Sequence, residues 1–94
     1  MNETIVYVDG VFDLFHVGHI SFLKKARQLG TKLIIGVVTD EDAISYKRRP
    51  IIPFQFRKEL IEELNIAIKV IPAMLHINKD FIETNNINIV VHAD

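Results

Sequence analysis

Two histidines, His16 and His19, lie three residues apart around a glycine in the stretch GVFDLFHVGH. The β-branched run 4–8 just before this stretch predicts a buried strand, and a helical pattern begins at Gly18. The start of a helix offers free backbone N–H groups and the positive end of the helix dipole, which favour anions. We therefore expect both imidazoles to point at a polyphosphate, with His16 just before the helix and His19 in its first turn.

A metal site and a packing role both remain open for the two histidines. The spacing of Asp13, His16 and His19 also suits metal ligands, and histidines at a helix start can serve packing alone. The two commonest phosphate-binding signatures, GxGxxG and GxxxxGK(S/T), do not follow the first strand. If the stretch binds phosphate, the histidines and the helix start must replace those signatures.

The composition is that of one small globular domain. Hydrophobic residues make up 49% of the 94 residues and charged residues 24%, so we expect a single domain over residues 1–94. Eleven basic against twelve acidic residues give a net charge of -1, which argues against a nucleic-acid partner. The chain has no cysteine, and its N-terminus lacks the order of a secretion signal. We expect a cytoplasmic protein that does not insert into membranes.

The elements that must hold the histidines alternate along the chain. The segment 40–49 is a loop or a short helix, and two prolines follow it in a turn. The expected strands are 4–8, 32–40, 67–71 and 87–92, and the expected helices are 18–29, 56–64 and 80–86. This alternation predicts an α/β fold of Rossmann-like type, with a parallel sheet between two layers of helices. Ligands of such a sheet bind at the carboxyl ends of its strands, where the histidine stretch lies.

The stretch GVFDLFHVGH resembles the G-x-F-D-x-x-H-x-G-H signature of the cytidylyltransferases, which belong to the HxGH nucleotidyltransferase superfamily. The resemblance extends over nearly the whole chain, through the segments Asp40-Glu41, Tyr46–Pro50, Arg57, Val70–Pro72 and Val91–Asp94. It implies the fold of that superfamily. It also implies an enzyme that transfers CMP from CTP to a small phosphorylated alcohol, such as glycerol 3-phosphate or phosphoethanolamine, and releases pyrophosphate. Such products are precursors of phospholipids or of the cell envelope.

The resemblance also implies roles for individual residues. His16 and His19 would stabilise the charge that develops at the α-phosphorus, and Lys47 would bridge the nucleotide and the incoming phosphate. Arg48 would help to bind the substrate, and Asp13 would orient the histidine loop. The implied nucleotide-binding residues are Gly10, Val11, Phe12, Asp13, His16, Gly18, His19, Lys47 and Asp94. Mg²⁺ would arrive on the nucleotide without protein ligands of its own, and the family implies a homodimer.

The sequence departs from the family pattern at three places. The segment 65–69 replaces the usual Arg-Tyr/Trp-Val-Asp-Glu stretch, so the dimer geometry does not carry over. Met74 and Leu75 stand where choline-specific members have a tryptophan, which disfavours phosphocholine. The sequence ends at Asp94, before the Ser/Thr-rich signature of the family, so we expect the domain to be incomplete and these residues alone to show little transfer.

Two alternatives to cytidylyl transfer remain. One is adenylyl transfer from ATP, and the other is a nucleotide-binding or dimerisation remnant without catalysis. Several polar residues are interpreted as structural. Arg57 lies on a predicted helix, where an arginine is ordinarily at the surface, and His76 and His92 are expected in a loop and at a strand end.

Overall fold

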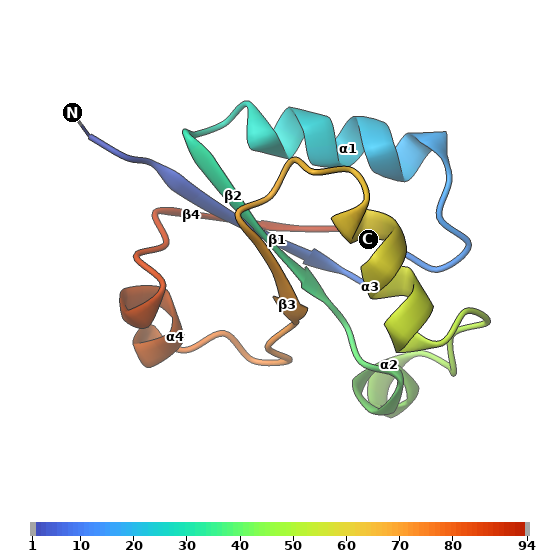
Figure 1. Ribbon diagram of the computed structural model, residues 1–94. Coiled ribbons are helices and arrows are strands. Elements are labelled where there is room, and N and C mark those ends of the chain that lie inside the picture. The colour runs from blue at the N-terminus through green and yellow to red at the C-terminus, as the bar shows by residue number, and fades with distance from the viewer. Residues whose placement is uncertain (1, 94) are drawn as a thin grey trace.

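The computed structural model describes residues 2–93, which form one sheet with helices on both of its faces (Figure 1). The elements are β1 (Ile5–Gly10), α1 (Val17–Arg27), β2 (Lys32–Val37), α2 (Asp40–Tyr46), α3 (Phe54–Glu62), β3 (Lys69–Pro72), α4 (Lys79–Thr84) and β4 (Ile89–His92). The predicted α/β class and the order of elements are confirmed. The segment left open as a loop or a short helix forms α2, and the other elements begin or end a few residues away from the predicted positions.

All strand pairs are parallel, and the strand order is β3-β2-β1-β4. The chain therefore moves outward from β1 through β2 to β3 and then returns to the other side of β1. This reversal places a topological switch point between the carboxyl ends of β1 and β4, where Asp9 lies opposite His92. Open α/β sheets bind their ligands at such a point.

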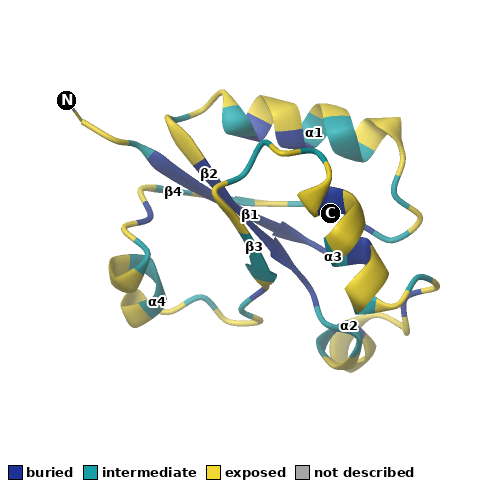
Figure 2. Ribbon diagram, viewed as in Figure 1, coloured by how far each residue is buried: buried dark blue, intermediate teal, exposed yellow. Residues whose placement is uncertain are grey.

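One face of the sheet carries the larger core. Helices α1 and α3 cover it, with Leu23, Ala26 and Ile61 packed against the two central strands (Figures 1 and 2). Every residue of β1 is buried, and β2 is buried beyond its first residue. Continuous burial of this kind is typical of parallel strands that are covered on both faces. The end of β1, from which the histidine loop departs, is therefore held in the best-packed part of the molecule.

The other face is covered by α4, a short helix without a buried residue of its own. The ring of Tyr7 packs edge-on against Phe81, with 5.0 Å between the ring centroids. The Tyr7 hydroxyl lies over Gly36, where a Cβ atom would overlap it. A glycine at this place in β2 therefore makes room for the phenol beneath the carboxyl edge.

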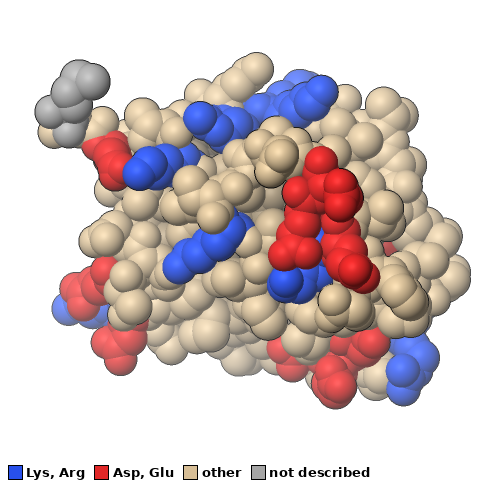
Figure 3. All heavy atoms as spheres, in the orientation of Figure 1, with Lys and Arg blue, Asp and Glu red and all other residues tan. Residues whose placement is uncertain are grey.

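Charged side chains of both signs are spread over the surface. Figure 3 shows acidic groups gathered over α2 and α3, with basic groups along α1. This mixture agrees with the nearly balanced charge of the sequence. Within residues 2–93, no helix is long and apolar enough to cross a membrane.

Candidate active site

The histidine loop, residues 11–16, connects the end of β1 to α1. Phe12 and Leu14 in this loop adopt left-handed backbone conformations, with φ of 55° and 48°. Such conformations cost a non-glycine residue roughly 1 kcal/mol or more, and they persist only where surrounding contacts hold them. The Phe12 side chain is buried in the larger core, which supplies one of these contacts.

Both histidines lie where the sequence predicts them. His16 is the N-cap of α1, and His19 follows in the first turn. Nδ1 of His16 accepts a hydrogen bond from the Gly18 N–H at 3.0 Å, and Nδ1 of His19 accepts one from the His16 N–H at 3.1 Å. In a neutral imidazole whose Nδ1 accepts, the proton is on Nε2. The helix start therefore presets both rings to offer an Nε2–H donor to a ligand.

Glycine at position 18 leaves room for the His16 ring in this turn. A Cβ atom there would approach Cε1 of His16 to 2.7 Å. The two imidazole centroids are only 4.1 Å apart, and the ring of Phe15 stacks on His19 at 5.3 Å. Partial burial and the neighbouring His16 lower the pKa of His19 below its ordinary value. The His19 ring is therefore neutral at pH 7 and carries one donor proton.

Asp13 ties the histidine loop to the turn before α3. Its carboxylate accepts hydrogen bonds from the backbone N–H groups of Ile51 and Ile52, at 2.8 and 2.9 Å. Partial burial acts to raise the pKa of Asp13, but these donors, the Leu14 N–H and the charge of Arg57 outweigh it and hold the pKa below its ordinary value. The predicted orienting role fits this geometry. Because both carboxylate oxygens are engaged with the backbone, the geometry does not favour Asp13 as a metal ligand beside the histidines.

Arg57 makes a second tie, and its predicted surface position is wrong. The side chain is fully buried, and its guanidinium donates to the carbonyls of Val11 and Val38 at 2.7 Å and to that of Ile52 at 2.8 Å. It also pairs with Asp40 at 2.7 Å. A buried charge needs this complete set of partners. Arg57 therefore joins the histidine loop, the end of β2 and the turn before α3 at one point.

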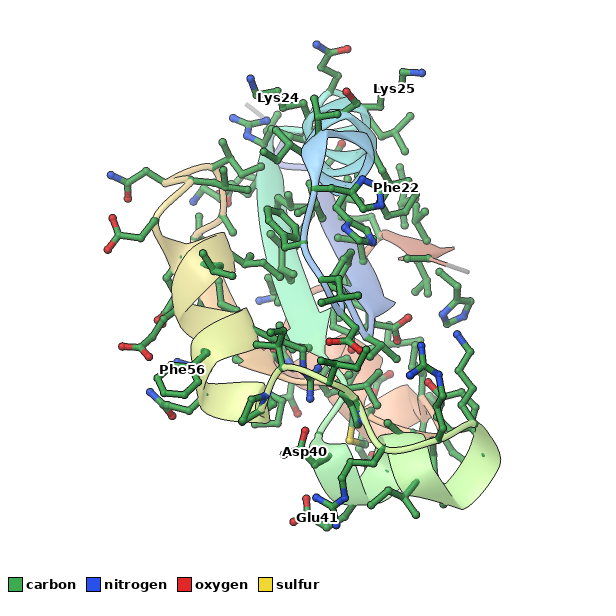
Figure 4. The ribbon with its side chains drawn as sticks, turned by 90° about the vertical axis from the view of Figure 1, so that its right-hand side faces the viewer. Phe22, Lys24, Lys25, Asp40, Glu41 and Phe56 are labelled. Atoms are coloured by element: carbon green, nitrogen blue, oxygen red, sulfur yellow. The ribbon has the colours of Figure 1, made fainter. Side chains whose placement is uncertain are left out.

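Figure 4 looks onto the edge where β1 and β2 end, with Asp40 and Glu41 at the start of α2. Asp40 also accepts a long hydrogen bond of 3.4 Å from the Phe54 N–H at the start of α3. The ion pair of Asp40 with Arg57 was not predicted from the sequence. The two residues are 17 apart and meet only after the sheet has formed, so no local pattern marks the pair.

Several of the residues expected to bind phosphate line one cavity of about 470 Å³, here called the histidine cavity. It lies between the histidine loop and the segment that follows α2. Its lining consists of Val11, Phe12, Asp13, His19, Lys47, Arg48 and Pro50. His16 lies beside His19 and is exposed. Two cationic side chains and an imidazole donor on one concave surface can bind a phosphate chain.

A second cavity, of about 480 Å³, opens on the same edge of the sheet. We call it the aspartate cavity. It lies at the switch point between β1 and β4, and its lining includes Asp9, Gly10, Tyr46, His76 and His92. Asp9 and Nδ1 of His92 are 2.7 Å apart. This cavity was not predicted from the sequence, and Gly10, which was expected among the phosphate-binding residues, lines it instead.

Two further predictions concern the set of ligands. Asp94 lies outside the described residues, so its predicted contact with the nucleotide stays a prediction. Within residues 2–93, no three His, Asp or Glu side chains come together as metal ligands. The chemical roles of His16, His19 and Lys47 likewise stay predictions, which substitutions at these positions can test.

Comparison with protein families bears directly on these expectations. Residues 7–94 match the model of the Cytidylyltransferase-like family. The chain belongs to this family. The matched region contains the histidine loop, Lys47 and both cavities, so the resemblance inferred from the signature is confirmed.

Individual relatives differ in the reaction that their names state. The chain is 40% identical to ethanolamine-phosphate cytidylyltransferase of Dictyostelium discoideum over 99% of its own length, and covers 27% of that protein. It is 34% identical to glycerol-3-phosphate cytidylyltransferase of Bacillus subtilis, of which it covers 72%. It is 47% identical to FAD synthase of Thermococcus kodakarensis over 69% of its length, and covers 44% of that protein. The chain thus spans about a quarter of the ethanolamine-phosphate relative.

A solved structure shows the same fold. The lipopolysaccharide core biosynthesis protein of Thermoplasma volcanium superposes with a TM-score of 0.77, covering 99% of this chain and 98% of that one at 23% identity. The similarity supports the Rossmann-like arrangement of the sheet and its helices.

Proposed function

We propose that this protein transfers CMP from CTP to a small phosphorylated alcohol, and that phosphoethanolamine is the acceptor that its two cavities fit best. The observation that carries the proposal is the preset pair of imidazoles at the start of α1, of which His19 lines the same cavity as Lys47 and Arg48. A donor and two positive charges around one cavity suit a reaction between two phosphates.

The reaction itself needs placement more than proton transfer. A phosphate oxygen of the acceptor attacks the α-phosphorus of CTP and forms a new P–O bond. The bond between the α-phosphorus and the oxygen that bridges the α- and β-phosphates breaks, and pyrophosphate leaves. The attacking phosphate is already ionised at neutral pH, so no general base is required. His16 and His19 donate from Nε2 to the nucleotide phosphates, and Lys47 holds the acceptor phosphate against them.

Mg²⁺ is the proposed cofactor, and it would neutralise charge on the triphosphate. The carboxylate of the histidine cavity, Asp13, is engaged by two backbone N–H groups. Mg²⁺ accepts phosphate oxygens and water as ligands and keeps several waters when bound. The ion therefore fits here as part of the nucleotide, held by its phosphates.

The aspartate cavity favours an acceptor with an amino group. Asp9 supplies a carboxylate to its lining, with a side chain only 12% exposed, and no lysine or arginine among residues 2–93 lines this cavity. An ammonium group gains from the Asp9 charge, whereas the neutral hydroxyl groups of glycerol 3-phosphate gain less. The name of the Dictyostelium relative agrees with this choice.

A coupled assay of pyrophosphate release tests the proposal. The whole protein is incubated with Mg²⁺ and either CTP or ATP, and with phosphoethanolamine, glycerol 3-phosphate or phosphocholine. The proposal predicts the highest kcat/KM for CTP with phosphoethanolamine. Equal or faster release without any acceptor would contradict it.

Adenylyl transfer is the second candidate, and the FAD synthase relative is the observation that favours it. The histidine cavity binds the phosphates, which CTP and ATP share, and the described contacts do not select a base. In the same assay, faster pyrophosphate release with ATP than with CTP would favour this candidate. It would also remove CMP transfer as the function.

A further inference from the structure

Tyr46 and Lys47 are consecutive residues that line different cavities. Tyr46, the last residue of α2, belongs to the aspartate cavity, and Lys47 belongs to the histidine cavity. The same division occurs at the end of β1, where Gly10 lines the aspartate cavity and Val11 lines the histidine cavity. The two cavities are thus lined by neighbouring residues along two short stretches of backbone.

The surroundings of Tyr46 suit a cationic group. The side chain is half exposed, so its ring is accessible from the cavity. Partial burial, together with the charges of Asp9 and Asp42, raises the pKa of Tyr46, which keeps the phenol neutral. The aromatic ring and the Asp9 carboxylate line the same cavity. A neutral aromatic face and a carboxylate are the two groups that attract an ammonium ion.

We propose that Tyr46 determines acceptor specificity by placing its ring against the ammonium end of the acceptor, while Lys47 binds the phosphate of the same molecule. The proposal rests on the proposed function, because it takes phosphoethanolamine as the acceptor. An acceptor whose far end is uncharged uses only the lysine.

The aromatic contact replaces the tryptophan that the chain lacks. The sequence predicts that phosphocholine is disfavoured, since Met74 and Leu75 stand where choline-specific members have a tryptophan and Trp is absent from the chain. Met74 and Leu75 do line the aspartate cavity, and Tyr46 enters it from α2. One aromatic ring with one carboxylate suits a primary ammonium, which also donates hydrogen bonds. A trimethylated ammonium cannot donate, so it gains less at this site.

Three variants test this proposal kinetically. Tyr46→Leu removes the aromatic face, and we expect the KM for phosphoethanolamine to rise about fivefold to twentyfold, the range of a partly desolvated cation–π contact. The KM for CTP and the KM for glycerol 3-phosphate should stay within about twofold. Tyr46→Phe keeps the ring and should behave as the wild type. Ile44→Ala is the matched control, because Ile44 is an exposed residue of the same helix and lines neither cavity.

A binding measurement separates this inference from the proposed reaction. In NMR spectra of the wild-type protein, phosphoethanolamine should shift the ring signals of Tyr46 and leave those of the buried Tyr7 nearly unchanged. If Tyr46 shifts but no CDP-ethanolamine forms, CMP transfer fails and the binding role stands. If phosphoethanolamine is turned over while Tyr46→Leu keeps the wild-type KM, the role of Tyr46 is overturned. Absence of any Tyr46 shift at saturating phosphoethanolamine would also overturn it.

Discussion

The two cavities at the carboxyl edge of the sheet are built differently. The histidine cavity has walls that are tied together, because Asp13 and Arg57 connect its loops through short hydrogen bonds to the backbone. The aspartate cavity is walled partly by exposed residues, Leu75 and His76, of the segment between β3 and α4. In the proposed function, the phosphates bind on the side with the tied loops. The far end of the acceptor binds on the side with the exposed segment.

Loss of the imidazole donors should have the largest effect on the side with the tied loops. We expect His19→Ala to lower kcat roughly 100- to 1000-fold, the range found when one donor to a developing charge is removed. Stability should fall by only about 1 kcal/mol, since the variant loses one capping hydrogen bond at the start of α1. Steady-state kinetics and urea unfolding check the two parts.

Gln28→Ala is the matched control for this variant, because Gln28 is an exposed residue at the other end of the same helix. It should change neither kcat nor stability. A His19→Ala protein with wild-type kcat, or one that loses most of its stability, would show that the imidazole serves packing and not the reaction.

Removal of Arg57 should loosen the loops that line the histidine cavity and destabilise the fold. Arg57→Met keeps the length of the side chain but leaves the carbonyls of Val11, Val38 and Ile52 without their donor and Asp40 without its partner. We expect a loss of about 3 kcal/mol in the free energy of unfolding, measured by urea denaturation. Lys58→Met, which removes a surface ion pair from the same helix, should cost less than about 0.5 kcal/mol. Equal losses in the two variants would contradict the assigned role of Arg57.

The smallest of these effects concerns Lys47. It is exposed, and it follows α2 directly. Lys47→Ala should lower kcat about tenfold to a hundredfold with unchanged stability, since the side chain acts on phosphates and not on the fold. Lys47→Arg should rescue it poorly, because a guanidinium is larger and planar. Arg49→Ala serves as a control, and an equal loss in that variant would reduce Lys47 to one member of a diffuse positive surface.

Much of this architecture follows from local patterns in the sequence. Buried strands such as Ile5–Gly10 show as continuous apolar runs, and the capped start of α1 shows as a glycine between two histidines. These features depend on residues that are close together in the sequence, so they can be predicted from the sequence alone.

The ties between loops could not be predicted in the same way. The bonds of Asp13 to Ile51 and Ile52 join residues almost 40 positions apart, and the pairing of Arg57 with Asp40 forms only when α2 and α3 pack beside the sheet. The burial of Arg57 could not be predicted from the sequence, because its partners are mostly backbone carbonyls, which every residue has.

The most direct test of the preset imidazoles is a long-range ¹H–¹⁵N NMR spectrum of the four histidines, recorded with and without magnesium-bound CTP. Without nucleotide, His16 and His19 should show the tautomer protonated at Nε2, and His19 should titrate below the ordinary pKa of histidine. Bound triphosphate should shift both Nε2 signals and raise the pKa of His19, because an anion favours the charged ring. His76, in the aspartate cavity, is the internal reference and should not respond. Nδ1-protonated rings, or nucleotide shifts at His76 with none at His16 and His19, would contradict the preset arrangement.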